Sequence, residues 1–198
     1  RNATAGGEEF DEAVFVDRSL ARLLLPHVAQ LTTVKHVVVM DDGTGDVPPI
    51  DAGLEVHDYE ALLAEAPPGD FTVDDEWRAA SMCYTSGTTG NPKGVVYTHR
   101  SSFLHTLGVM AAGTLAIDEP DRVLPIVPMF HANAWGLAHA AVAAGASLVL
   151  PGSDLSPAAV VDLIESERVT VAAGVPTIWM GVLPELDGRD TSSLRSIV

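Results

Sequence analysis

The sequence has a single cysteine, Cys83, among its 198 residues. One thiol cannot form a disulfide within the chain, which favours a reducing compartment, the cytoplasm. The sequence also lacks an apolar run near the roughly 18 residues that a membrane-spanning helix needs. Residues 1–12 are polar and acidic, unlike the apolar core of a secretory signal peptide. These absences predict a cytoplasmic protein without a membrane span.

Basic residues are scarce. Eleven Lys and Arg residues face 27 Asp and Glu residues, and the net charge of −16 excludes nucleic acid as a favoured partner, because phosphate backbones repel acidic chains. Residues 81–117 contain no Asp or Glu, although Lys93 and Arg100 lie among them. A buried segment avoids charge in the same way, so this carboxylate-free window fits either a core element or a site that an anion approaches.

Short β-branched runs alternate with helical stretches, which predicts an α/β fold with a mostly parallel sheet and flanking helices. We expect two lobes: residues 1–78, a βαβ lobe with acidic loops, and residues 79–198, a more regular lobe. The strands expected are 13–16, 36–40, 79–84, 94–98, 122–127, 147–150, 169–173 and 194–198. The first helix expected is 19–31, interrupted by Pro26, and the second is 59–66. The others are one capped by Ser101 or Ser102 and ended by Gly113, 134–144, one opening at Ser156-Pro157, and 176–183; residues 41–53 are expected to form a loop.

The most informative segment is Tyr84–Gly94, with the sequence YTSGTTGNPKG. Its glycines allow backbone amides to approach a ligand closely, and Lys93 adds a compact positive charge. Four hydroxyls add donors, from Thr85, Ser86, Thr88 and Thr89. This is not a Walker A loop, because Pro92 precedes the lysine, Gly94 follows it, and the next element is a strand. A glycine-rich loop alone is more often a plain hairpin, but this composition inside the carboxylate-free window favours a phosphate-binding loop.

The run YTSGTTGNPKG resembles the phosphate loop of the acyl-adenylate-forming (AMP-binding) superfamily, which includes acyl-CoA and aryl-CoA ligases, luciferases and peptide-synthetase adenylation domains. Residues 127–136, VPMFHANAWG, resemble the segment that lines the acyl pocket of medium- and long-chain fatty-acyl-CoA ligases. Residues 172–177, AAGVPT, resemble the strand-to-helix turn beside that pocket. The family's adenine, ribose and C-terminal lysine segments are missing, so the resemblance implies an internal fragment of the large N-terminal domain, inactive by itself.

The resemblance also implies a chemistry. A carboxylate attacks the α-phosphorus of Mg·ATP, pyrophosphate leaves, and the thiol of coenzyme A then takes the acyl group. Thr85 is implied to hold Mg²⁺, while Lys93 and His131 take catalytic positions near the phosphates and the carboxylate. The remaining implied ligands are Ser86, Gly87, Thr88, Thr89 and Gly90 for ATP, and Phe130, His131, Ala132, Trp135, Val175 and Thr177 for the acyl group. The family also implies a fatty acid and coenzyme A as small-molecule substrates and a homodimeric parent.

Several residues have a plainer reading. Taken alone, His131 is more typical of a hydrogen-bonded core histidine and Trp135 of a packing residue, and Cys83 is typical of a small buried residue. Trp179 is assigned to the core, and four histidines without metal-ligand spacing are read as structural: His27, His36, His57 and His139. Two other functions remain open, a non-catalytic nucleotide- or acyl-binding module and a ligase for an aromatic or short-chain acid.

Overall fold

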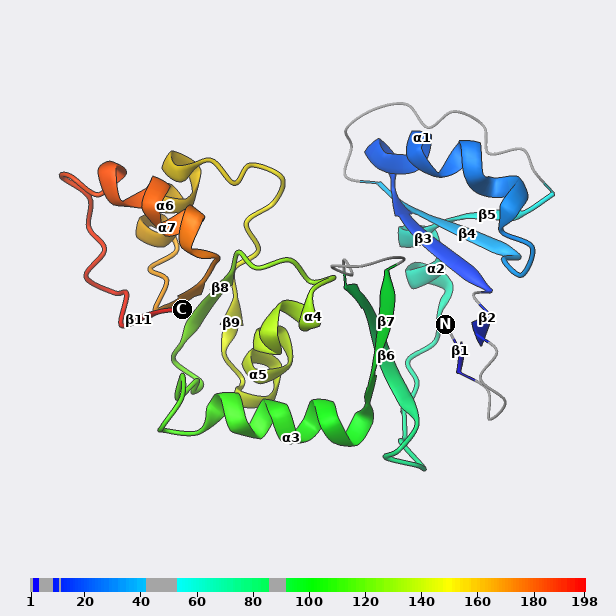
Figure 1. The fold of residues 1–198 in the computed structure, drawn as a ribbon, viewed down its shortest axis with the longest axis horizontal. Coiled ribbons are helices and arrows are strands. Elements are labelled where there is room, and N and C mark those ends of the chain that lie inside the picture. Colours follow the sequence, from blue (N-terminus) through cyan, green and yellow to red (C-terminus); the bar gives the residue numbers. More distant parts are fainter. Residues whose placement is uncertain (1, 4–8, 11, 42–52, 86–91) are drawn as a thin grey trace. The chain divides into compact units, whose positions relative to one another are not determined.

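The computed structural model describes residues 2–3, 9–10, 12–41, 53–85 and 92–198 (Figure 1). The chain divides into two compact units, residues 1–74 and residues 75–198. Most of the expected 41–53 loop, at 42–52, lies outside the described residues. No helix in the described part of the chain combines the length and the apolar character needed to cross a membrane.

The first unit contains a parallel sheet in the order β3-β4-β5. Its strands are β3 (Ala13–Asp17), β4 (His36–Met40) and β5 (Glu55–Asp58). Three consecutive valines of β4, residues 37–39, are buried, as expected of a central strand. The predicted strands 13–16 and 36–40 are confirmed, and their parallel pairing confirms the βαβ unit. A separate antiparallel pair, β1 (Asn2–Ala3) and β2 (Glu9–Phe10), precedes this sheet.

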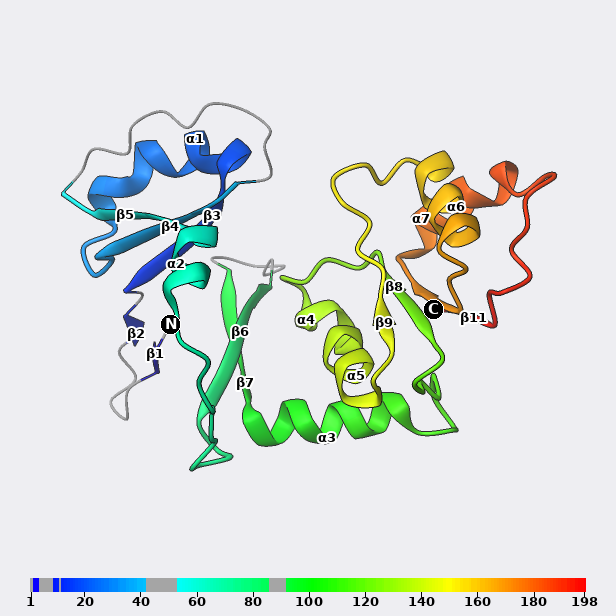
Figure 2. The same ribbon diagram turned by 180° about the vertical axis from the view of Figure 1, so that it is seen from behind.

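The segment expected as a helix over 19–31, interrupted by Pro26, forms a broken crossover from β3 to β4. It consists of η1 (Arg18–Leu20), α1 (Ala21–Leu24) and η2 (Leu25–Gln30). Pro26 lacks an amide hydrogen, and its ring crowds the preceding turn, so an α-helix cannot pass through it undisturbed. The expected helix 59–66 is present as α2 (Tyr59–Glu65), capped by Asp58, whose carboxylate accepts from the amide of Ala61 at 2.8 Å. Figures 1 and 2 show α1 and α2 on opposite sides of the sheet.

The second unit begins with an antiparallel hairpin of β6 (Ala79–Thr85) and β7 (Lys93–Thr98). The next helix, α3 (His99–Met110), is capped by Thr98, not by Ser101 or Ser102 as expected, and it ends before Gly113. The expected cap is one turn late because Ser101 belongs to a capping box. Its amide donates to the Thr98 hydroxyl at 3.0 Å, and its own hydroxyl accepts from the Thr98 amide at 2.9 Å.

A parallel sheet in the order β11-β10-β8-β9 forms the centre of the second unit. Its strands are β8 (Arg122–Pro125), β9 (Ser147–Leu148), β10 (Val171–Ala173) and β11 (Ser196–Ile197), shorter than the runs expected from the sequence. After α3 come the short α4 (Ala132–Trp135) and the helices α5 (Leu137–Ala144), α6 (Pro157–Ser166) and α7 (Pro176–Val182), followed by η3 (Leu183–Glu185). The expected Ser156 cap of α6 and the Gly145 end of α5 are confirmed.

Successive side chains of each strand point to opposite faces of the sheet, so this unit has two hydrophobic cores. Val123 of β8 belongs to a cluster with α5 and the end of α3, whereas its neighbour Leu124 belongs to a cluster with α6 and α7. In the same way Val171 and Ala173 of β10 face the first cluster, and Ala172 faces the second. Helices therefore cover both faces of the sheet (Figure 2), the α/β layering expected from the sequence.

A buried carboxylate joins the amino ends of three strands of this sheet. Asp121, 5 % exposed, accepts hydrogen bonds from Arg195 at 2.6 and 2.9 Å, from the Thr170 hydroxyl at 2.6 Å and from the Asp118 amide at 2.9 Å. These bonds, led by the one from Arg195, lower the pKa of the Asp121 carboxyl from 3.8 to about 2, against the opposing effect of burial. The cluster fixes the starts of β8, β10 and β11 together.

Candidate functional site

The carboxyl ends of β8 and β10 lie side by side and define one edge of the sheet. Pro125 pairs with Ala173, and the amides of Ile126 and Val127 both donate to the Ala173 carbonyl, at 2.8 and 3.1 Å. Two of the expected acyl-binding segments, 130–135 and 175–177, therefore leave neighbouring strands at the same edge. Open parallel sheets bind their ligands at this edge, so the topology suits the expected site.

The segment that follows β8 has an unusual backbone. In α4 (Ala132–Trp135) every residue has a positive φ, between 47° and 55°, and Gly136 follows at 74°. The expected helix 134–144 therefore starts only at Leu137. A left-handed conformation costs a residue with a Cβ roughly 1–2 kcal/mol. Four such residues in a row must be held by contacts elsewhere, and strain of this kind concentrates at functional sites.

One of those contacts comes from Asn133. Its side-chain Nδ2 donates to the Ser81 hydroxyl at 2.9 Å, and its Oδ1 accepts from the Cys83 thiol at 3.4 Å. Ser81 and Cys83 are alternate residues of β6, so they present their side chains on the same face of the strand. Cys83 is buried, as expected. The left-handed turn is thus fastened to the strand that leads into YTSGTTGNPKG.

A second contact comes from α3. The Nε2 atom of His105 lies 2.9 Å from the backbone oxygen of Trp135, which identifies Nε2 as the protonated nitrogen, since a carbonyl can only accept. A cavity of about 490 Å³ opens beside this contact. It is lined by residues of β7, α3, α4 and α5: Tyr97, Ser101, Ser102, His105, Ala132, Asn133, Trp135, Gly136 and His139.

Ala132 and Trp135 are the expected acyl-site residues that line this cavity, and Trp135 also packs against the first core cluster. Sequence reasoning missed the polar wall, namely Tyr97, His105 and Asn133. The available signal was that Tyr97 and His105 lie inside the carboxylate-free window. His139, expected to be structural, is exposed and lines the cavity.

The other expected acyl-site residues lie at the exposed sheet edge and not in this cavity. Phe130 is 74 % exposed and Val175 is 43 % exposed. His131 and Thr177 are also exposed, and the His131 amide donates to the Pro128 carbonyl at 3.0 Å. Trp179 packs against the second core cluster, as expected, and its indole N–H donates to the Gly174 carbonyl at 3.0 Å.

The expected ATP ligands Ser86, Gly87, Thr88, Thr89 and Gly90 lie outside the described residues. The structure does describe the two strand ends that this segment connects. Thr85, the last residue of β6, pairs with Lys93, the first residue of β7. Lys93 is exposed. The hairpin register therefore keeps the two ends of the segment adjacent.

Comparison with known proteins gives one family and several relatives. Residues 11–198 match the family model described as AMP-binding enzyme. The chain is 45 % identical over 175 residues to the 3-methylmercaptopropionyl-CoA ligase of Ruegeria lacuscaerulensis, covering 87 % of this chain and 32 % of the relative. It is 43 % identical over 190 residues to the long-chain-fatty-acid–CoA ligase of Thermus thermophilus, covering 95 % of this chain and 33 % of the relative.

A solved structure shows the same fold. The putative long-chain-fatty-acid CoA ligase from Rhodopseudomonas palustris superposes with a TM-score of 0.74 at 20 % sequence identity, covering 94 % of this chain and 44 % of the other. At that identity the likeness concerns the fold alone. It agrees with the α/β layering and the parallel sheets described above.

Proposed function

Because this chain belongs to the AMP-binding enzyme family, we propose that it supplies the phosphate loop and the acyl pocket of an AMP-forming fatty-acid–CoA ligase. Such an enzyme forms an acyl-adenylate from a carboxylate and ATP, releases pyrophosphate, and transfers the acyl group to coenzyme A. The chain spans about a third of the length of the relatives that it matches, 32 % and 33 %. The complete reaction is therefore proposed for a longer protein that contains these residues.

The observation that carries the proposal is the attachment of the left-handed turn to β6 through Asn133. The first chemical step joins two anions, a carboxylate and the α-phosphate, so the acyl group and ATP must be held in register. In the proposed enzyme, residues 130–135 present the acyl group and residues 84–94 hold the phosphates. The hydrogen bond from Asn133 to Ser81 links residues 130–135 to the strand that leads into residues 84–94.

The donors of the phosphate segment fit a polyphosphate. Lys93 is exposed at the start of β7, and residues 81–117 contain no carboxylate that would repel an anion. We assign Lys93, with the backbone and hydroxyls of Ser86, Gly87, Thr88, Thr89 and Gly90, to the β- and γ-phosphates. Thr85 offers a hydroxyl oxygen, the hard type of ligand that Mg²⁺ prefers, and is assigned to that ion. When bound, Mg²⁺ neutralises charge on the departing pyrophosphate.

We assign binding of the acyl group to the sheet edge and to the neighbouring cavity. His131 is proposed to lie beside the carboxylate, and Phe130, Ala132, Trp135, Val175 and Thr177 to contact the chain of the acid. Phe130 and Val175 are exposed apolar side chains, as expected of residues that await an apolar ligand. We propose a medium- or long-chain fatty acid as substrate, and hence a role in fatty acid metabolism. A short-chain acid is the second candidate, favoured by the 45 % identity to a 3-methylmercaptopropionyl-CoA ligase.

Three further proposals complete this function. The single cysteine fits a cytoplasmic enzyme, and the resemblance suggests a homodimer. By themselves residues 1–198 carry only the phosphate part of the proposed nucleotide site. We therefore expect millimolar or weaker binding of Mg·ATP, equivalent to about −4 kcal/mol, and no formation of acyl-adenylate.

The test is acid-dependent release of pyrophosphate by the longer protein, assayed with 3-methylmercaptopropionate, octanoate, palmitate and ferulate. Lys93→Ala should remove most of the activity without loss of fold, since an exposed lysine contributes little to stability. Lys35→Ala is the matched control, because Lys35 is the other lysine of the sequence. No release of pyrophosphate with any of these acids would favour a non-catalytic binding module. Activity with ferulate alone would favour an aromatic-acid ligase.

A further inference from the structure

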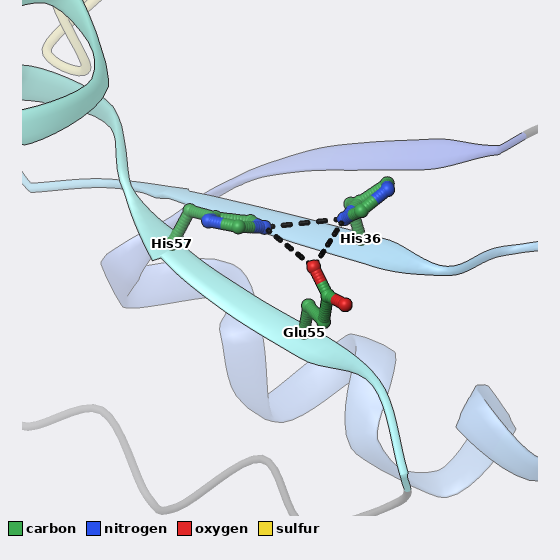
Figure 3. A group of neighbouring side chains, drawn as sticks. All are labelled: His36, Glu55 and His57. Carbon is green, nitrogen blue, oxygen red and sulfur yellow. Dashed lines mark hydrogen bonds and ion pairs between the residues drawn. The ribbon is translucent and has the colours of Figure 1, made fainter. Parts of the chain in front are cut away.

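Three side chains with metal-binding atoms converge in the first unit, and none of them is assigned to the proposed ligase site, whose residues belong to the second unit. His36 comes from the central strand β4, while Glu55 and His57 come from the neighbouring strand β5. The register pairs His36 directly with Glu55, and His57 lies two residues further along β5. Side chains at positions i and i+2 of a strand point to the same face, so the pleat directs all three to one side of the sheet. Figure 3 shows both rings and the carboxylate pointing toward one another.

The distances between the three facing atoms match those of a metal coordination shell. His36 Nδ1 lies 3.2 Å from His57 Nε2 and 3.3 Å from Glu55 Oε2, and His57 Nε2 lies 3.8 Å from that oxygen. Ligands about 2.0–2.2 Å from a tetrahedral Zn²⁺ ion are separated from each other by about 3.3–3.6 Å. One ion can therefore contact all three atoms with shifts of a few tenths of an ångström.

Protons satisfy this arrangement less well than a cation does. A carboxylate only accepts hydrogen bonds, and a neutral imidazole carries one N–H on its two nitrogens. If both rings are neutral with their hydrogens on the outer nitrogens, three lone pairs face each other with no donor between them. A single N–H directed inward can point at only one of the two remaining acceptors. A divalent cation accepts all three lone pairs at once.

The surroundings also favour a cation. The first unit, residues 1–74, has 15 acidic and 4 basic side chains. The site is open to solvent, since the side chains of His36 and His57 are 40 % and 30 % exposed and that of Glu55 is 72 % exposed. A metal ion can enter without unfolding the sheet, and water can take a fourth position. Two imidazoles and one carboxylate are a ligand set that suits Zn²⁺ and its late first-row neighbours better than Mg²⁺ or Ca²⁺.

We propose that His36, Glu55 and His57 form a binding site for a late first-row divalent metal ion, Zn²⁺ in the first place. The ion links the central strand β4 to β5, which lies at the end of the sheet order and pairs with β4 alone in the described part of the unit. Its effect is to hold β5 and the start of α2 against the sheet. The site shares no residue with those assigned to ATP or the acyl group, so the proposal does not depend on the proposed function.

The test uses residues 1–198, freed of metal with a chelator, and titrates ZnCl₂ calorimetrically. We expect one site per chain with a micromolar dissociation constant. His36→Gln and His57→Gln should each weaken binding at least tenfold, and Glu55→Gln, which keeps the shape but removes the charge, should weaken it as well. His27→Gln is the matched control, because His27 is an exposed histidine of the same unit outside the cluster. It should bind as the parent chain does.

Two further readouts separate a built site from loose association. Co²⁺ should give the intense visible absorption of tetrahedral coordination, and Zn²⁺ should raise the melting temperature of the parent chain but not of His36→Gln. Thermal melts in the presence of chelator show whether each variant folds. If a histidine variant does not fold, Glu55→Gln, which changes an exposed side chain, still tests whether the cluster binds Zn²⁺. Equal Zn²⁺ binding by the parent chain and His36→Gln, no binding by the parent chain, or only the weak spectrum of octahedral Co²⁺ would overturn the proposal.

Discussion

The Asn133 side chain donates a hydrogen bond to the Ser81 hydroxyl at 2.9 Å, across 52 positions of the sequence. It thereby connects the left-handed turn after β8 to the strand before the phosphate segment. Asparagine suits this position for two reasons. It tolerates the positive φ of 52° better than most residues, and its side-chain amide both donates and accepts hydrogen bonds. A side chain therefore links the turn to the hairpin, whose strands β6 and β7 pair only with each other among the described strands.

The first prediction concerns this bond. Asn133→Ala should lower the free energy of unfolding of the chain by about 1–2 kcal/mol, because it leaves Ser81 and Cys83 without their partner and puts alanine at a positive φ. Asn133→Gly separates these causes, since glycine accepts the backbone conformation but lacks the amide. A double-mutant cycle with Ser81→Ala, read from urea denaturation, measures the bond itself. A coupling energy near zero would show that the bond does not hold the turn.

The second prediction concerns the glycine at the end of the turn. A Cβ at Gly136 would lie 2.5 Å from the His105 ring, and the φ of this residue is +74°. Gly136→Ala should therefore displace His105 from the Trp135 carbonyl, narrow the cavity and lower the melting temperature. Gly188→Ala is the control, since Gly188 has the same backbone strain, φ +75°, but nothing within 4 Å of the new Cβ. The difference between the two melting temperatures isolates the clash, and equal shifts would contradict it.

Much of the fold could be predicted from patterns that act locally. Three consecutive valines, residues 37–39, are typical of a buried strand. Ser156-Pro157 predicts a helix start, because serine caps the helix and the fixed φ of proline suits its first turn. Strand β5 could not be predicted, because Glu55–Asp58 has one apolar residue, and it is the pairing with β4 that makes it a strand. Pro26 predicts an interruption of the helix 19–31, but not that 3₁₀ turns, Arg18–Leu20 and Leu25–Gln30, form most of this crossover.

The candidate site divides in the same way. A motif of consecutive residues, such as YTSGTTGNPKG, can be recognised from the sequence, although the roles of its residues remain predictions. The left-handed turn cannot, because Ala132, Ala134 and Trp135 have no preference for positive φ and are held there by distant partners. The cluster of His36, Glu55 and His57 was missed for a related reason. Its ligands follow the register of two strands and not a spacing along the chain.

The third prediction is a pH dependence of stability. The pKa of Asp121 is lowered to about 2 by its hydrogen bonds, first of all those from Arg195, and is near 3.8 when the chain is unfolded. Because the folded pKa is the lower one, the stabilisation is complete above about pH 4 and is lost as the pH falls through 2. The difference corresponds to about 2 kcal/mol. Urea denaturation between pH 5 and pH 2 should show a smaller decline for Asp121→Asn than for the parent chain.

The control for that measurement is Asp187→Asn, because Asp187 is an exposed aspartate of the same unit. This variant should follow the parent chain over the whole range. If Asp121→Asn declined as steeply as the parent chain, other carboxylates would account for the acid sensitivity. The cluster at the starts of β8, β10 and β11 would then contribute to the fold by geometry and not by charge.

The last prediction concerns the acid that the proposed ligase accepts. Trp135 lines the cavity and Val175 is exposed at the sheet edge, so both are proposed to contact the acyl chain. Trp135→Ala and Val175→Phe, made in the longer protein, should move the optimum of kcat/KM along a series of fatty acids, toward longer acids for the first and shorter ones for the second. Each methylene that gains or loses a contact should contribute about 0.8 kcal/mol. Trp179→Phe is the control, because Trp179 packs against the second core cluster and should change all acids alike. A parallel loss for every acid in Trp135→Ala would instead make Trp135 a packing residue, in keeping with its contact to the first core cluster.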